Sequence, residues 1–132
     1  MHTDAWTTTA PHPADDLVIA AGTDHVRLVY DYLDTGDVDA CASLLHEHVA
    51  LDLPGAPPVR GRTAFLRTHR DHLGAPARHE IDHVVARDRT VVVSGRRVGT
   101  DPDGTTARFV DVFRIAADGM VESCTRYYHA EP

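Results

Sequence analysis

TTARFVDVFRIAADGMVESCTRYYH, residues 105–129, is the stretch from which the fold of this chain can be inferred. It contains two runs rich in β-branched and aromatic residues, separated by the turn sequence AADG. Two such runs around Asp-Gly are typical of a β-hairpin. If Asp118 and Gly119 form a two-residue type I′ loop, the register of the hairpin is determined. The expected cross-strand pairs are Asp111 with Arg126, Phe113 with Cys124, and Phe109 with Tyr128.

Two runs upstream, His79–Ala86 and Val91–Thr100, have the same composition and are bounded by the turns ARDRT and DPDG. With Thr105–Ala116 and Met120–His129 they predict an antiparallel meander of four strands. Its register through DPDG is expected to place Arg96 opposite or diagonal to Asp111. One face of the sheet is then expected to carry Arg96, Phe109, Asp111, Phe113, Arg126 and Tyr128. The other is expected to carry Val91, Val93, Val110, Val112, Val121, Thr125 and Tyr127.

The first half of the chain has helical periodicity instead. A helix capped by Thr23 is expected to bury Val26, Val29, Tyr30 and Leu33 along one stripe. Asp37 can cap a second helix, a short strand follows, and a third helix is then expected. Helices followed by an antiparallel meander predict an α+β fold with the helices on one face of the sheet. The expected segments are a helix with Val38, Cys41, Leu44 and Leu45, a strand at Val49–Leu53, and a helix at Thr63–Leu73 that buries Ala64 or Phe65 with Leu66.

Two further expectations concern the N-terminal segment and the sheet face that the helices leave uncovered. Residues 1–20 are polar, contain proline and lack periodicity, so we expect a flexible arm, with at most a short helical turn at Asp15–Ala21, before one domain at residues 21–132. Both predicted sheet faces are too apolar to be exposed to water, and the helices can cover only one. We therefore expect a second copy of the chain to cover the other face in a homodimer.

The composition excludes several classes of function. The chain of 132 residues has 13 Lys and Arg against 20 Asp and Glu, a net charge of −7, which argues against nucleic-acid binding. All of its basic residues are Arg, so lysine Schiff-base chemistry is excluded. Cys41 and Cys124 are expected to be buried thiols and not a disulfide. No apolar run is long enough to span a membrane and no basic leader opens the sequence, so we expect a cytoplasmic protein.

Asp111 is the most unusual residue of the predicted sheet, because it lies on a face made mainly of Phe109 and Phe113. An unpaired charge there would be unfavourable. One interpretation is a structural ladder in which Asp111 neutralises Arg96 and Arg126. The other makes Asp111 a base in a pocket, beside two cations that stabilise an enolate, phenolate or alkoxide.

Other acids and phenols are possible members of the same site. Asp52 is either a second carboxylate of the pocket or a solvated residue at the end of a strand. Tyr30 can donate its hydroxyl into the pocket or simply pack in the core. Tyr128 shares the predicted face of Asp111, and its alternative role is to pair with Phe109.

Ten histidines raise the question of a metal. Residues 79–83 spell HEIDH, a match to the HExxH motif, but zinc binding by this motif needs a helix. Pro76 and the Val-rich sequence around it favour a strand, so we expect no metal and no cofactor. His46 with His48, and His69 with His72, are expected to be surface residues. His83 is the one histidine that we consider as a proton shuttle.

The order of these elements resembles the nuclear transport factor 2-like superfamily, in its SnoaL-like polyketide cyclase and ketosteroid isomerase branch. The resemblance covers residues 24–130 and rests on four phrases in order: VRLVYDYLDTGDVDACASLL, VALDLPG, VRGRTAFL and FVDVFRIAADGMVESCTRYYHA. It implies a curved sheet wrapped by three helices into a cone with a deep pocket, and usually a homodimer. The superfamily hosts isomerases, cyclases, dehydratases, epoxide hydrolases and binding proteins.

The resemblance also implies residue roles. Asp111 falls where the isomerases keep a protonated Asp and where epoxide hydrolase-like members keep an acid. The general base of the isomerases falls at Leu53, next to Asp52, and their oxyanion tyrosine falls at Val29, next to Tyr30. The aspartate on the last strand of the epoxide hydrolases falls at Arg126.

These observations predict a cofactor-independent enzyme that isomerises, cyclises or ring-opens a hydrophobic, oxygenated, polyketide-like metabolite, as in antibiotic biosynthesis. The expected catalytic residues are Asp111, Asp52, Tyr30, Tyr128 and His83, and the expected substrate-binding residues are Arg96, Arg126, Phe109, Phe113 and Leu53. The alternative is a binding protein of the same fold without catalysis, which Leu53 at the position of the family's base favours.

Overall fold

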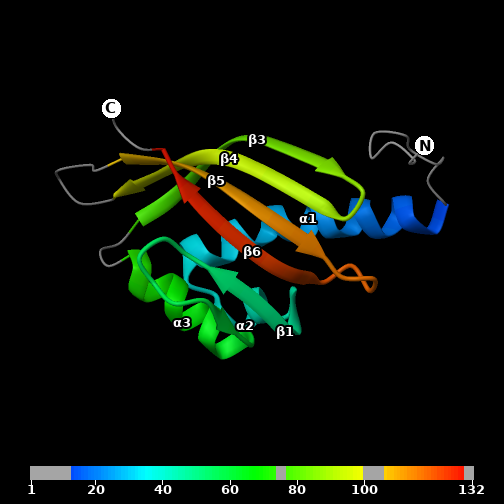
Figure 1. Cartoon of the computed structure of the whole chain (residues 1–132), viewed down its shortest axis with the longest axis horizontal. Coiled ribbons are helices and arrows are strands. Elements are labelled where there is room, and N and C mark those ends of the chain that lie inside the picture. Colours follow the sequence, from blue (N-terminus) through cyan, green and yellow to red (C-terminus); the bar gives the residue numbers. More distant parts are fainter. Residues whose placement is uncertain (1–12, 74–76, 100–105, 130–132) are drawn as a thin grey trace, which may run out of the picture.

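The computed structural model of the protein describes residues 13–73, 77–99 and 106–129. A mixed sheet of six strands is covered on one face by the helices (Figure 1). The architecture is α+β, as predicted. In chain order the elements are α1 (Pro13–Thr35), α2 (Val38–Ala42), β1 (Leu45–Asp52), β2 (Val59–Arg60), α3 (Arg62–Leu73), β3 (Ala77–Arg87), β4 (Thr90–Gly99), β5 (Thr106–Ile115) and β6 (Val121–Tyr128).

The sheet has the strand order β2-β1-β6-β5-β4-β3. Strand β1 runs parallel to β6, and all the other neighbours are antiparallel. The predicted meander is therefore confirmed as β3 to β6, and β1 extends it on the far side of β6. Among the helices described, none combines the length and the apolar composition that a membrane crossing needs.

Helix α1 begins ten residues earlier than the predicted cap at Thr23, at Pro13. Proline suits the first position of a helix, and Asp15 and Asp16 in the first turn interact favourably with the helix dipole. The hydroxyl of Thr23 donates to the Ile19 carbonyl inside the helix, at 2.8 Å. Residues 13–20 thus belong to a helix, whereas residues 1–12 of the predicted arm lie outside the described residues.

Three of the four residues of the predicted stripe of α1 are buried, since Val26, Val29 and Tyr30 are at most 3% exposed, and Leu33 is partly buried against the same core. Asp37 caps α2, as predicted, by accepting from the Ala40 amide at 3.1 Å. The second helix is shorter than expected, because it ends at Ala42, Leu44 lies in the turn that follows and Leu45 begins β1. The third helix is confirmed, and Phe65 is its fully buried residue.

The hairpin of β5 and β6 has the predicted register, with Asp111 opposite Arg126 and Phe113 opposite Cys124. Its turn differs from the predicted type I′ loop. Gly119 is the residue of the turn with a positive φ, and its amide donates to the Ala116 carbonyl. A bulge at the end of β5 then restores the pairing that the two-residue loop would have produced.

The register of β4 against β5 differs from the prediction. Val93 lies opposite Asp111, and Arg96 lies opposite Arg108. A change of one residue in register moves every side chain to the other face of a strand. Val91 and Val93 are therefore fully buried on the face of Asp111, and Arg96 points to the opposite face. Val121, which we expected on that opposite face, is also fully buried.

A bulge in β3 separates the two histidines of the HEIDH sequence. The register against β4 shifts between Ile81 and His83. In an uninterrupted strand, His79 and His83 would share a face, because side chains alternate with period two. The structure instead buries His79 and exposes His83. The prediction that this sequence forms a strand is confirmed, and its inward-facing histidine is His79.

Candidate active site

A buried ion pair occupies the centre of the inner sheet face. Arg126 donates from Nε to Asp111 Oδ1 and from Nη2 to Asp111 Oδ2, both at 2.8 Å. The two side chains have no exposed surface. The hydroxyl of Tyr30, on α1, donates to Asp111 Oδ2 at 2.6 Å. Both oxygens of Asp111 are thus occupied, which makes this carboxylate a poor candidate for a catalytic base.

Burial and the ion pair keep the protons of this cluster in place. Burial raises the pKa of Tyr30 well above its ordinary value, and the charge of Asp111 raises it further. Burial alone would lower the pKa of Arg126, but the hydrogen bond and the charge of Asp111 outweigh it and raise this pKa. Arg126 is therefore a permanent cation, and Tyr30 holds its proton as a donor to Asp111.

The ring of Phe109 is the surface around which the polar groups gather. Arg126 Cζ lies over its face, 4.2 Å from the ring centroid. The imidazole of His79 meets the same ring at 89°, with the centroids 5.6 Å apart. The ring of Tyr30 is a further neighbour of Phe109, with 6.1 Å between the two centroids, and it contacts Phe113 edge-on. The predicted pocket residues Phe109 and Phe113 are both buried here.

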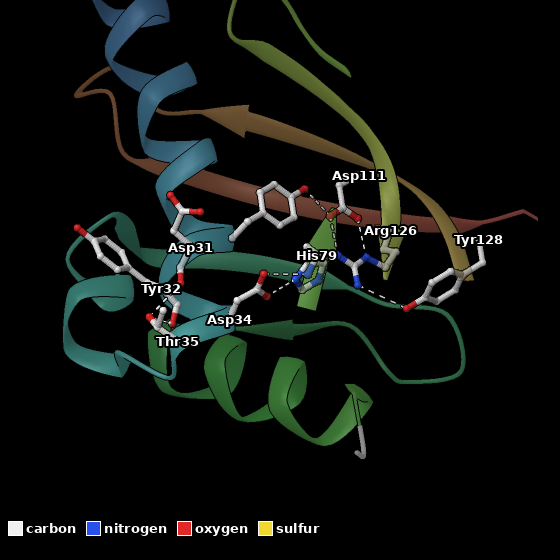
Figure 2. Close-up of polar contacts among 9 residues, drawn as sticks. Asp31, Tyr32, Asp34, Thr35, His79, Asp111, Arg126 and Tyr128 are labelled. Atoms are coloured by element: carbon white, nitrogen blue, oxygen red, sulfur yellow. Dashed lines mark hydrogen bonds and ion pairs between the residues drawn. The ribbon is translucent and has the colours of Figure 1, made fainter. Parts of the chain in front are cut away.

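An Asp–His pair lies beside this cluster. Nδ1 of His79, on β3, lies 2.6 Å from Asp34 Oδ1, and the backbone amide of His79 donates to Asp34 Oδ2 at 2.8 Å (Figure 2). Asp34 belongs to the last turn of α1. Since a carboxylate oxygen accepts hydrogen bonds, the tautomer of His79 that fits this contact has its proton on Nδ1 and its lone pair on Nε2. A histidine oriented in this way is equipped to act as a general base.

Two buried ring nitrogens have no hydrogen-bond partner within the described ranges, His79 Nε2 and His69 Nδ1. The rings of His69 and His79 are 6.3 Å apart, and the His79 side chain is fully buried. Buried polar atoms are nearly always hydrogen-bonded, to protein, water or ligand. The two nitrogens are therefore the candidate positions for a polar contact with a group from outside the chain.

Tyr128 forms the outer end of the cluster. Its hydroxyl accepts a long hydrogen bond from Arg126 Nη1 at 3.4 Å and lies 2.7 Å from His72 Nε2 (Figure 2 shows the first contact). The rings of His72 and Tyr128 are stacked. Burial and the charge of Arg126 lower the pKa of His72, so this histidine is neutral near pH 7.

The remaining predicted site residues lie elsewhere. Asp52 and His83 are exposed, and Leu53 is a buried core residue. Arg96 is not part of a ladder with Asp111, because it points to the outer face and forms an exposed ion pair with Glu80 at 2.9 Å. The residue that joins Arg126 in binding the Asp111 carboxylate is instead Tyr30, through its hydroxyl.

Sequence reasoning missed four members of the site: Asp34, His69, His72 and His79. One signal was available, because Asp34 follows Tyr30 by four residues and thus shares its face of the helix. His69 and His72 were expected at the surface, yet His69 is 2% exposed and His72 is half-buried.

The described residues contain no candidate metal centre. Nowhere in the described parts of the chain do three His, Cys, Asp or Glu side chains gather in a way that could hold a metal ion. Cys41 and Cys124 are free and buried, as predicted. Burial, together with Asp37, raises the pKa of Cys41 to about 11, so its thiol is unreactive at neutral pH.

The buried ion pair generates a prediction about stability. Asp111→Leu should lower the free energy of unfolding by about 3–5 kcal/mol, because it leaves Arg126 buried without its counterion. The double variant Asp111→Leu/Arg126→Leu should cost much less than the two single changes added together. Arg96→Leu, which removes an exposed pair, should cost about 1 kcal/mol or less. Urea unfolding of the four variants measures this, and additive losses would contradict the coupling.

His69 generates a prediction about pH. Burial, with Arg126 adding to it, holds the pKa of His69 well below its ordinary value. Below a pH of about 6.5 the unfolded chain binds a proton at this position that the folded chain does not, so stability falls with falling pH. Between pH 6.5 and 5.5, His69→Gln should remove about 1 kcal/mol of that loss. Unfolding curves at both pH values test it, with exposed His48→Gln as the control that should change nothing.

Comparison with known proteins places this geometry in a family. Residues 26–123 match the family model of the SnoaL-like domain. No curated protein matches the sequence. A ketosteroid isomerase-type structure from Kribbella flavida is similar at 21% identity and a TM-score of 0.74, over 86% of this chain and 83% of the other.

Two further solved structures carry epoxide hydrolase names. The epoxide hydrolase/cyclase-like enzyme SalBIII, with a role in pyran ring formation in the polyether salinomycin, is 22% identical over 88% of this chain and 94% of its own, with a TM-score of 0.71. A limonene-epoxide-hydrolase-like (LEH-like) epoxide hydrolase of M. tuberculosis is 16% identical over 84% of each chain, with a TM-score of 0.72. These structures share the fold, and the family model that matches residues 26–123 identifies this chain as a member of the SnoaL-like family of the nuclear transport factor 2-like superfamily.

Proposed function

We propose that the protein is a cofactor-independent acid–base enzyme that isomerises, cyclises or ring-opens a hydrophobic, oxygenated small molecule of secondary metabolism. One observation carries this proposal: a fully buried histidine whose Nδ1 is held by Asp34 and whose Nε2 has no partner within the described part of the chain. His79 would take a proton from carbon or oxygen of the substrate. The aromatic surroundings suit an apolar substrate body.

Arg126 would stabilise the negative charge that proton removal creates. Asp111 holds the guanidinium through Nε and Nη2, so Nη1 is the nitrogen best placed for a substrate oxygen. A fixed cation in a buried site stabilises an oxyanion more strongly than the same cation in water. In this assignment Asp111 and Tyr30 position Arg126, and His79 takes the role of base that the sequence suggested for Asp111.

The related structures support the same class of chemistry. Their names include a ketosteroid isomerase type, an epoxide hydrolase/cyclase-like enzyme of pyran ring formation and an epoxide hydrolase. Leu53, at the position of the isomerases' base, favoured a binding protein without catalysis. His79 supplies a base from a different strand, which removes that objection.

The proposal predicts turnover of a generic probe. In 5-nitrobenzisoxazole a base removes the hydrogen on C3 while the N–O bond breaks, and a coloured cyanonitrophenolate forms. The protein should accelerate this reaction, and His79→Gln should lower kcat/KM by at least about 100-fold, because general bases contribute that much. Asp34→Asn should cause a smaller loss, since it frees the orientation of the imidazole.

The matched control is His48→Gln, which removes an exposed histidine and should retain the full rate. Melting curves should show that all variants are folded. Wild-type rates in folded His79→Gln would refute the proposed base. A rise in melting temperature with an apolar ligand, without any turnover of the probe, would favour the binding protein instead.

We also propose a homodimer formed through the outer face of the sheet. Val85, Val110 and Tyr127 are 62%, 37% and 59% exposed, and the described helices cover the opposite face (Figure 1). Two of these residues, Val110 and Tyr127, also line a groove of about 390 Å³. Its lining residues are Asp82, Ser94, Gly95, Arg108, Phe109, Val110, Tyr127, Tyr128 and His129.

Sedimentation tests the dimer. The wild-type protein should sediment as two chains at micromolar concentration, because exposed apolar side chains on one face mark an interface. Tyr127→Glu should shift the population to single chains. Leu17→Glu changes an apolar residue of α1 that is even more exposed, at 73%, and should have no effect. A wild-type protein that sediments as one chain would exclude the dimer.

A further inference from the structure

The hydroxyl of Tyr128 lies between a buried cation and a half-buried histidine. It is 3.4 Å from Arg126 Nη1 and 2.7 Å from His72 Nε2. The His72 and Tyr128 rings stack at 19°, with their centroids 5.6 Å apart, which fixes the orientation of both. His72 comes from the last turn of α3, and Tyr128 is the last residue of β6. Two distant parts of the chain thus meet at this hydroxyl.

Arg126 determines where a negatively charged oxygen would bind next to this contact. Its Nε and Nη2 are bound to Asp111 at 2.8 Å, whereas among the described residues Nη1 makes the long contact to Tyr128. An oxyanion that binds at Nη1 would therefore lie within reach of the Tyr128 hydroxyl. A phenol at this place can complete a proton transfer that the cation alone can only stabilise.

We propose that His72 is a positioning residue that passes protons from solvent to Tyr128, which donates them to the oxygen that becomes negative at Arg126. The proposal rests on the proposed function, in which His79 removes the substrate proton. His72 suits this task because it is half-buried: part of it is exposed to solvent, and its Nε2 contacts the Tyr128 hydroxyl.

The protons balance over one cycle. His79 gains the proton that the substrate loses from carbon, and Tyr128 gives its proton to the leaving oxygen. The Tyr128 phenolate then takes the proton from His72 Nε2, while His72 Nδ1 accepts one from water and leaves a hydroxide ion in solvent. Proton exchange with solvent returns His72 to the tautomer that carries its proton on Nε2. His79 finally releases its proton to solvent. A neutral imidazole can carry out this relay because it has one N–H and one lone pair, and the lowered pKa of His72 keeps it neutral near pH 7.

Two probes that differ in their leaving group test the relay. Elimination of 5-nitrobenzisoxazole releases a weakly basic phenolate that needs little protonation, whereas 1,2-benzisoxazole releases a more basic one. We expect His72→Gln to lower kcat/KM at least ~10-fold on 1,2-benzisoxazole and less than ~2-fold on the nitro compound. Tyr128→Phe should show the same selectivity. Added imidazole should restore part of the lost rate in His72→Ala.

The double variant Tyr128→Phe/His72→Gln tests whether His72 acts through Tyr128. It should be no slower than Tyr128→Phe alone, because a residue without its partner has nothing left to contribute. His48→Gln is the matched control and should leave both rates unchanged. Equal losses on the two probes, or additive losses in the double variant, would overturn the relay and leave the proposed function intact. Turnover of the nitro compound that does not depend on His79 would overturn both.

Discussion

The fully buried pair of Asp111 and Arg126 is the interaction on which the rest of the site depends. Two charges without exposed surface are stable only when their geometry is good and their remaining hydrogen-bonding positions are occupied. The bidentate contact satisfies the first condition, and the hydroxyl of Tyr30 contributes to the second. Because the three residues come from α1, β5 and β6, the pair also ties the first helix to the centre of the sheet.

This constraint explains the division of roles around it. A carboxylate that accepts from three donors is not available as a base, so the base of the function that we propose is another residue. His79 has the required features, because Asp34 orients one nitrogen and leaves the other free of described partners. Phe109 contacts both the imidazole and the guanidinium and keeps them over one apolar surface. The proposed base and the cation thus share one aromatic neighbour at the centre of the candidate site.

A bulge in one strand and the register of another determine which residues enter this interior. The bulge in β3 turns His79 inward and His83 outward, although their spacing in a regular strand would place them on one face. The register of β4 against β5 likewise brings Val93 opposite Asp111 and sends Arg96 outward to Glu80. Each feature changes the strand pairing by one residue. A change of one residue moves every side chain beyond it to the other face of the sheet.

The sequence by itself determined the α+β class, the buried stripe of α1 and the pairing of Asp111 with Arg126, because periodicity and turn residues act over short distances along the chain. Only the tertiary structure decided that Asp34 meets His79, since 45 residues separate them and no local pattern encodes that contact. The same holds for Tyr30 with Asp111. Contacts between a helix and a sheet depend on how the two surfaces pack, and one residue of bulge or register in β3 or β4 is enough to exchange the side chains that face the site.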